Sequence, residues 1–240
     1  MSNSSKQGLT GWKIERRQIG AEKEPLLVID NFAPQPDAWV KYAGILDFRK
    51  LAPYYPGVRA PISADYLRLH VEPLQPLLAE VFGYTNGARL VESFYSIVTT
   101  PPGDLAPLQR MPHFDGGGDE KLALLHYLCP AAMGGTAFYR HESTGYQTVP
   151  DAKYPAYKAS LEADVEKHGM PAPEYFRNSN DMFERIGSCD AAFNRAVVYR
   201  GTNLHAIDLP EAFAFDPSPA TGRLTINTFL LPAWLSALNR

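Results

Sequence analysis

Apolar residues in the first third of the chain fall into short runs separated by polar connections. Residues 26–32 (Leu-Leu-Val-Ile-Asp-Asn-Phe) are mostly apolar and end in a turn signal, which predicts a short buried strand. Over residues 38–48 the large apolar side chains recur at helical spacing, which predicts an amphipathic helix. Residues 64–82 predict a second helix, which Pro73 and Pro76 break or kink because proline lacks an N–H and clashes with the preceding turn.

The pattern changes from about residue 88 to that of strands, with β-branched and aromatic runs between Pro- and Gly-rich turns. Residues 151–183 interrupt this pattern with charged residues, and we interpret them as an insertion holding a helix from about 155 to 168. Helices followed by six or more strands favour a mainly β (α+β) fold, a sandwich or barrel with helices on one side. The predicted strands are 90–99, 121–129, 136–141, 195–200, 204–209 and 223–231.

The polar N-terminal residues, the length of the remaining chain and its proline content indicate the domain organisation. We expect residues 1–25 to form a loosely held polar arm and residues 26–240 to form one domain, with a loop over 51–62. The 21 prolines among 240 residues are almost twice the usual share, which excludes an architecture of long helices. The apolar share of 45% argues against wholesale disorder.

Charge and cysteine content narrow the possible partners. The 23 basic and 26 acidic side chains give a net charge of −3, so we expect no binding to nucleic acid or membrane surfaces. The two cysteines do not make a disulfide framework, and neither a signal peptide nor a membrane-spanning run is present in the sequence. We therefore expect a soluble cytoplasmic protein, whose oligomeric state the sequence does not reveal.

The sharpest chemical feature is His113-Phe114-Asp115, within a loop rich in Pro and Gly. In an extended segment, residues i and i+2 project to the same side, so the imidazole and the carboxylate can meet on one ion. The tripeptide alone is a weak signal, since Asp115 is followed by three glycines and also suits a turn.

Other residues strengthen that signal. His205 starts a later strand, and two histidines with one carboxylate are the ligand set of non-haem Fe(II) oxygenases, which leaves metal positions open for substrates. Arg223 begins the last strand, and its planar guanidinium can pair with a carboxylate through two hydrogen bonds. Thr225 shares its strand face and could reach the same carboxylate.

Five segments in order, together spanning residues 26–231, resemble the 2-oxoglutarate/Fe(II)-dependent oxygenases, in particular the prolyl-4-hydroxylase-like branch. The intervals before His205 and before Arg223 are longer than is usual in that branch. The segments are Leu26 to Phe32 with its following helix, His113-Phe114-Asp115, Leu124 to Leu128 with Gly134 to Phe138, Asn194 to His205, and Gly222-Arg223-Leu224-Thr225.

The resemblance implies a fold, a site and a reaction. The fold would be a double-stranded β-helix, or jelly-roll barrel, with flanking N-terminal helices. His113, Asp115 and His205 would bind Fe(II), while Arg223, Tyr127 and Thr225 would bind the far carboxylate of 2-oxoglutarate. The enzyme would use O2 to hydroxylate its substrate, releasing succinate and CO2. The sequence leaves that substrate open between a peptidyl residue and a small metabolite.

Two alternatives stay open from the sequence. One is a non-catalytic β-barrel that keeps the fold as a binding protein. The other is a cupin-like metalloenzyme that uses no 2-oxo acid, in which Arg223 would point away from the metal. Affinity for iron and for 2-oxoglutarate separates the three readings.

Overall fold

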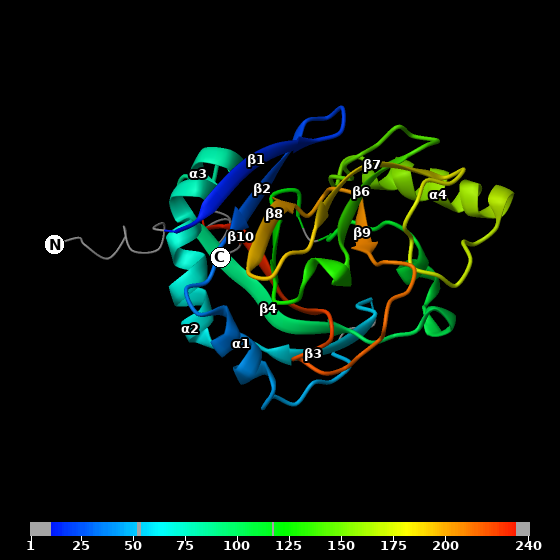
Figure 1. The fold of residues 1–240 in the computed structure, drawn as a ribbon. Coiled ribbons are helices and arrows are strands. Elements are labelled where there is room, and N and C mark those ends of the chain that lie inside the picture. Colours follow the sequence, from blue (N-terminus) through cyan, green and yellow to red (C-terminus); the bar gives the residue numbers. More distant parts are fainter. Residues whose placement is uncertain (1–10, 52–53, 117, 234–240) are drawn as a thin grey trace.

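The protein consists of two antiparallel β-sheets with helices packed outside them, as a computed structural model shows (Figure 1). The structure describes residues 11–51, 54–116 and 118–233. The strands are β1 (Lys13–Ile19), β2 (Glu24–Asp30), β3 (Gly57–Pro61), β4 (Ala88–Val98), β5 (Leu122–Tyr127), β6 (Gly135–His141), β7 (Phe183–Asp190), β8 (Arg195–Arg200), β9 (His205–Asp208) and β10 (Leu224–Pro232). The helices are α1 (Pro36–Ala43), α2 (Ala64–Tyr66), α3 (Gln75–Phe82) and α4 (Tyr154–His168), and a π-helical segment (Leu67–Val71) and a 3-10 turn (Glu72–Leu74) connect α2 to α3.

The larger sheet has seven strands in the order β1-β2-β8-β5-β10-β4-β3, and the smaller sheet has the order β7-β6-β9. All pairings between these strands are antiparallel. One face of the large sheet packs against α2, α3 and the segment between them. The other face packs against the small sheet, where Phe138 and Cys189 meet Val197 and Tyr199. The predicted mainly β class is confirmed, in a jelly-roll-like arrangement.

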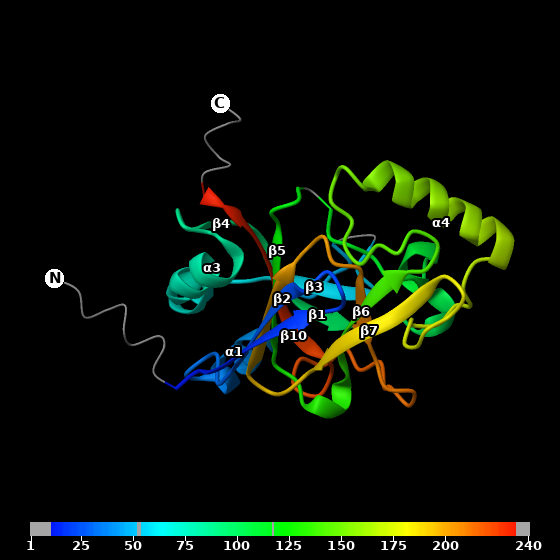
Figure 2. The ribbon, with the colours of Figure 1, turned by 90° about the horizontal axis from the view of Figure 1, so that it is seen from above.

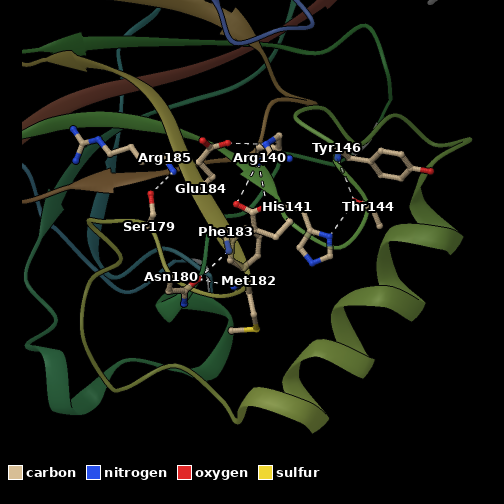
Figure 3. A network of polar contacts seen from close by, with 11 residues as sticks. Arg140, His141, Thr144, Tyr146, Ser179, Asn180, Met182, Phe183, Glu184 and Arg185 are labelled. Atoms are coloured by element: carbon tan, nitrogen blue, oxygen red, sulfur yellow. Dashed lines mark hydrogen bonds and ion pairs between the residues drawn. The ribbon is translucent and has the colours of Figure 1, made fainter.

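Figure 2 shows α4 on the far side of the small sheet from α1 and α3. This helix corresponds to the one expected from about 155 to 168, and it lies between β6 and β7 in the chain. A polar contact links it to β6, since the imidazole Nε2 of His141 lies 3.1 Å from the Asp164 carboxylate. Figure 3 shows the neighbouring contacts, including the 3.0 Å hydrogen bond between His141 and Thr144.

Three strands differ from the expectations. Part of the arm expected over residues 1–25 is β1, which pairs along its whole length with β2, while residues 1–10 lie outside the described residues. β3 lies inside the expected loop 51–62, and β7 follows the expected insertion. The helical segment 64–82 is broken as predicted, with Pro73 and Pro76 in the first turns of the 3-10 turn and α3.

Both cysteines are free and buried. In the described ranges, no helix has the length and the apolar composition that crossing a membrane needs.

Candidate metal centre

The main chain holds the three proposed ligands in place. His113 and His205 form an antiparallel bridge with two hydrogen bonds of 2.8 Å between their backbone N–H and C=O groups. The backbone N–H of Asp115 donates to the carbonyl oxygen of Gly201 at 2.7 Å. Because His113 and Asp115 are two residues apart in an extended segment, both side chains project to the side where His205 lies.

The side chains of these residues converge. One ligand atom from each of His113, Asp115 and His205 lies within 4.8 Å of the others. The imidazole centroids of the two histidines are 4.4 Å apart, and the Nε2 atom of His205 lies 3.6 Å from the Asp115 carboxylate. His205 is buried, Asp115 is half-buried and His113 is the most exposed of the three. The sequence pattern therefore brings together the residues that it predicts.

The protonation of the histidines suits metal binding. Desolvation lowers the pKa of both His113 and His205 to about 4, and the charge of His205 also lowers the pKa of His113. Both rings are therefore neutral at pH 7. The Nδ1–H of His205 donates to the carbonyl oxygen of Asn203 at 2.8 Å, which leaves the lone pair on Nε2. This tautomer presents Nε2 as a ligand toward Asp115.

Asp115 places a carboxylate oxygen beside the two imidazoles. Its Oδ2 atom is buried and accepts no hydrogen bond from residues 11–51, 54–116 or 118–233. Burial raises the pKa of Asp115, and the positive charges of Lys121 and Arg59 oppose that shift. A buried carboxylate oxygen beside two neutral imidazoles is a donor set for a divalent transition metal, so these residues fit the group that the motif predicts.

Arg223 lies directly before β10 and is 2% exposed. It donates from Nε to the carbonyl oxygen of Met133 at 3.1 Å and from Nη2 to that of Gly135 at 2.8 Å. Within residues 11–51, 54–116 and 118–233, it forms no ion pair with a carboxylate. Burying an unpaired charge costs several kcal/mol in real proteins, so the guanidinium suits a bound anion.

Two hydroxyl groups also lie near Arg223. The hydroxyls of Tyr55 and Ser96 are buried and make no hydrogen bond of regular geometry with the described residues, although Tyr55 lies near both Ser96 and Thr225. Ser96 lies opposite Thr225 in the pairing of β4 with β10, so both side chains project from the same face of the sheet. Arg223 is close enough to Tyr55 for its charge to lower the pKa of that phenol against the effect of burial. Together Arg223, Tyr55 and Ser96 form a cluster of hydrogen-bond donors, which we call the cradle.

Tyr127 and Thr225 make different contacts in the site. The hydroxyl of Tyr127 lies 2.7 Å from that of Thr136, and its ring lies 5.6 Å from the Arg223 guanidinium carbon. Tyr127 therefore presents its ring to Arg223, with its hydroxyl engaged elsewhere. The Thr225 hydroxyl donates to Asn227 at 2.7 Å and can still accept a hydrogen bond.

Tyr55 and Ser96 are not predictable from the sequence pattern. Tyr55 lies in the expected loop 51–62, where nothing in the local pattern distinguishes it from Tyr54. Ser96 is one polar residue in an apolar strand, and its alternation with Phe94 and Val98 is the available signal that it shares their face. The pairing of β4 with β10, which places Ser96 beside Thr225, is not readable from either segment alone.

A family model, described as "Family of unknown function (DUF6445)", matches residues 10–230. The chain belongs to this family. A search of curated proteins gives no match for this DUF6445 protein.

Solved structures with a similar fold include a protein with 2-oxoglutarate bound and an enzyme that depends on it. HygX from Streptomyces hygroscopicus, with nickel and 2-oxoglutarate bound, has a TM-score of 0.53 at 12% identity over 89% of this chain and 85% of its own. The epimerase SnoN from nogalamycin biosynthesis, described as non-heme and alpha-ketoglutarate-dependent, has a TM-score of 0.50 at 10% identity over 88% of this chain and 79% of its own. The DUF6445 protein thus shares the fold of these proteins, and the prolyl-4-hydroxylase-like branch stays a prediction from the motifs.

Proposed function

We propose that the protein is an Fe(II)- and 2-oxoglutarate-dependent dioxygenase that hydroxylates an unidentified substrate with release of succinate and CO2. The observation that carries the proposal is the buried Arg223, unpaired with any described carboxylate, together with the converging side chains of His113, Asp115 and His205. Tyr199 lies near both, because its ring is 5.0 Å from that of His205 and the charges of Asp115 and Arg223 both act on its pKa. A metal centre alone would not need such a cation. A 2-oxo diacid needs both a metal and a counter-charge for its far carboxylate.

The chain's own residues would bind and orient the cosubstrate. His113, Asp115 and His205 would hold Fe(II), which with O2 supplies the oxidising chemistry when bound. Arg223 would bind the far carboxylate of 2-oxoglutarate through its free N–H groups, and the hydroxyls of Tyr55 and Ser96 would donate to it. The Thr225 hydroxyl would donate to the same carboxylate by turning from Asn227, its acceptor in the structure.

Tyr127 would act as a positioning residue, because its ring lies against the Arg223 guanidinium and Thr136 fixes its hydroxyl. Residues 26–240 would form one such oxygenase domain, to which β1 adds its strand. The similar fold of HygX, which is solved with nickel and 2-oxoglutarate, supports this function. The description of SnoN names an epimerase, so the shared fold does not by itself imply hydroxylation. Hydroxylation is therefore part of what we propose.

The proposal is tested by binding and by turnover. Calorimetry under anaerobic conditions measures Fe(II) and then 2-oxoglutarate binding to the wild type, and aerobic incubation measures succinate formation. His113→Ala should lose Fe(II) affinity. Arg223→Ala should keep Fe(II) affinity and lose about 100-fold in 2-oxoglutarate affinity, since hydrogen bonds to charged groups contribute about 1.5–3 kcal/mol each.

A matched control is Arg68→Ala, because Arg68 is exposed and pairs with Asp65 on the surface. It should bind both ligands as the wild type does. A wild type that binds iron but not 2-oxoglutarate would favour the cupin-like reading. A wild type that binds neither would favour a binding protein without the chemistry.

A further inference from the structure

A second arginine, Arg59, lies in the same row of side chains as the proposed cosubstrate residues. Arg59 of β3 pairs with Ser96 of β4, Ser96 pairs with Thr225 of β10, and Thr225 pairs with Tyr127 of β5. Directly paired residues of antiparallel strands project to the same side of the sheet. The side chain of Arg59 therefore emerges on the face that carries Thr225 and Tyr127.

Two aromatic rings hold the guanidinium of Arg59. Its Cζ atom lies 4.4 Å from the ring centroid of Tyr55 and 5.5 Å from that of Phe94. Its Nε atom is buried without a hydrogen-bond partner, and the part of the chain that the structure describes offers the side chain no ion pair. The rings orient the planar group, while its N–H edges stay without acceptors. Such a guanidinium is pre-organised for an anion.

Arg59 lies beside the proposed cosubstrate residues, on a part of the sheet that solvent reaches. Three side chains of β4 and β10 on this face, those of Phe94, Asn227 and Phe229, are partly exposed. Residues between them, such as Tyr95, Ile226 and Thr228, face the helices and are buried. A small molecule can therefore approach Arg59 from this side.

Arg223 and Arg59, neither of which pairs with a carboxylate of the described residues, differ in how deeply they are buried. Arg223 is buried and already donates to two backbone carbonyls, whereas Arg59 is half-buried and donates no hydrogen bond from its side chain within the described residues. The far carboxylate of 2-oxoglutarate needs one such partner, because its other carboxylate belongs at the metal. The half-buried Arg59 is therefore not accounted for by the cosubstrate.

We propose that Arg59 binds an anionic group, a carboxylate or a phosphate, of the substrate and so selects substrates of that class. This inference rests on the proposed function, since it assigns the deeper Arg223 to 2-oxoglutarate. Tyr55 would serve both sites, with its ring under Arg59 and its hydroxyl in the cradle beside Arg223.

The test loads the whole protein with Ni(II) and 2-oxoglutarate and measures both affinities by calorimetry. Benzoate and phenyl phosphate are then titrated as anionic probes, with benzamide and benzyl alcohol as neutral counterparts, and saturation-transfer NMR reports binding. The variants are Arg59→Gln, Arg59→Lys and Arg223→Gln. Arg49→Gln is the matched control, because Arg49 bridges Arg59 through the backbone while its exposed side chain pairs with Asp47.

We expect at least one anionic probe to bind the wild type at least tenfold more tightly than its neutral counterpart. The preferred probe distinguishes a carboxylate from a phosphate site. Arg59→Gln should weaken that probe at least tenfold and change the 2-oxoglutarate affinity by less than twofold. Arg59→Lys, which keeps the charge and loses the planar fork, should lose at least threefold. Arg49→Gln should change neither affinity.

Three outcomes would overturn the inference. One is equal affinity of the wild type for the anionic and neutral probes, and another is an unchanged anion affinity in Arg59→Gln. The third is a loss of 2-oxoglutarate affinity in Arg59→Gln as large as in Arg223→Gln, which would assign Arg59 to the cosubstrate. Should Arg59→Gln fail to fold, Arg59→Lys decides by the same criteria. A wild type that does not take up Ni(II) and 2-oxoglutarate fails at the first step, and that result contradicts the proposed function itself.

Discussion

The imidazole of His205 is fixed by the backbone of Asn203, not by its side chain. Nδ1–H donates to the Asn203 carbonyl oxygen at 2.8 Å, which turns Nε2 toward Asp115, 3.6 Å away. The amide side chain of Asn203 makes a separate contact, donating to the carbonyl oxygen of Arg200 at 3.0 Å. The ligand geometry at His205 therefore depends on the course of the chain between β8 and β9.

This relationship predicts opposite results for two neighbouring substitutions. His205→Ala should lower Ni(II) affinity at least 100-fold, because it removes a ligand while the backbone bridge to His113 remains. Asn203→Ala should keep Ni(II) affinity within about threefold and cost about 1 kcal/mol of unfolding free energy for its lost hydrogen bond. Calorimetry and urea unfolding measure the two effects. A large loss of metal affinity in Asn203→Ala would show that its side chain matters to the site.

Gly201 sets the position of Asp115. Its carbonyl oxygen accepts from the Asp115 N–H at 2.7 Å, and a Cβ atom on Gly201 would lie 3.2 Å from the Cβ of Asp115. Gly201→Ala should therefore displace the carboxylate by a few tenths of an ångström and weaken Ni(II) binding about tenfold, with all three ligands still present. Gly103→Ala is the control, because a Cβ there meets no atom within 4 Å. Equal Ni(II) affinity in the two variants would contradict this prediction.

The buried hydroxyl of Tyr55 predicts a separation between stability and cosubstrate binding. Tyr55→Phe removes a buried hydroxyl that makes no regular hydrogen bond with the described residues, so the free energy of unfolding should stay nearly equal or rise. The same change should weaken 2-oxoglutarate binding about fivefold to tenfold, for the loss of about 1 kcal/mol of hydrogen bonding. Calorimetry in the presence of Ni(II) measures the affinity.

Tyr175→Phe is the matched comparison for Tyr55→Phe. Its hydroxyl donates to the carbonyl oxygen of Thr100 at 2.8 Å, so its removal should lower the free energy of unfolding by about 1 kcal/mol. It should leave 2-oxoglutarate affinity as it is. The cradle would need revision if Tyr55→Phe destabilised the protein and left that affinity unchanged.

Much of the fold was predictable because apolar runs mark the strands that are buried. The strands β2, β5, β8 and β10 lie side by side in the large sheet, and all four were predicted from such runs. The missed strands carry weaker signals. β1 is an edge strand of mostly charged and exposed residues, β3 is an edge strand with a glycine and a proline, and β7 contains Gly187 and Ser188.

The residues of the candidate site also divide into those that the local sequence predicts and those that only the tertiary fold brings together. His113 and Asp115 could be paired from spacing alone, because two residues in an extended segment share a side. Arg223 and Thr225 were predicted as a unit for the same reason. Tyr55, Ser96 and Arg59 belong to the site through strand pairing across β3, β4 and β10, which depends on the tertiary fold. Local sequence carries no record of which strands become neighbours.

Buried neutral histidines link stability to pH. His126 is fully buried, with its Nδ1 2.9 Å from the Tyr66 hydroxyl and its Nε2 3.1 Å from the amide oxygen of Asn194. Desolvation lowers its pKa to about 3. The unfolded chain has the ordinary histidine pKa of about 6.5 and therefore binds more protons than the folded chain between pH ~6.5 and pH ~3. Stability is consequently lost as the pH falls through that range.

His126→Gln should reduce this loss. At pH 5 the wild type should have lost about 2 kcal/mol of unfolding free energy through His126, since about 1.5 pH units separate pH 5 from the unfolded pKa. Glutamine cannot titrate, so the difference in unfolding free energy between pH 7 and pH 5 should be smaller by about that amount. Urea unfolding at both pH values measures it, and the variant's own destabilisation cancels in the difference. An equal difference in wild type and variant would show that His126 does not titrate on unfolding as its burial predicts.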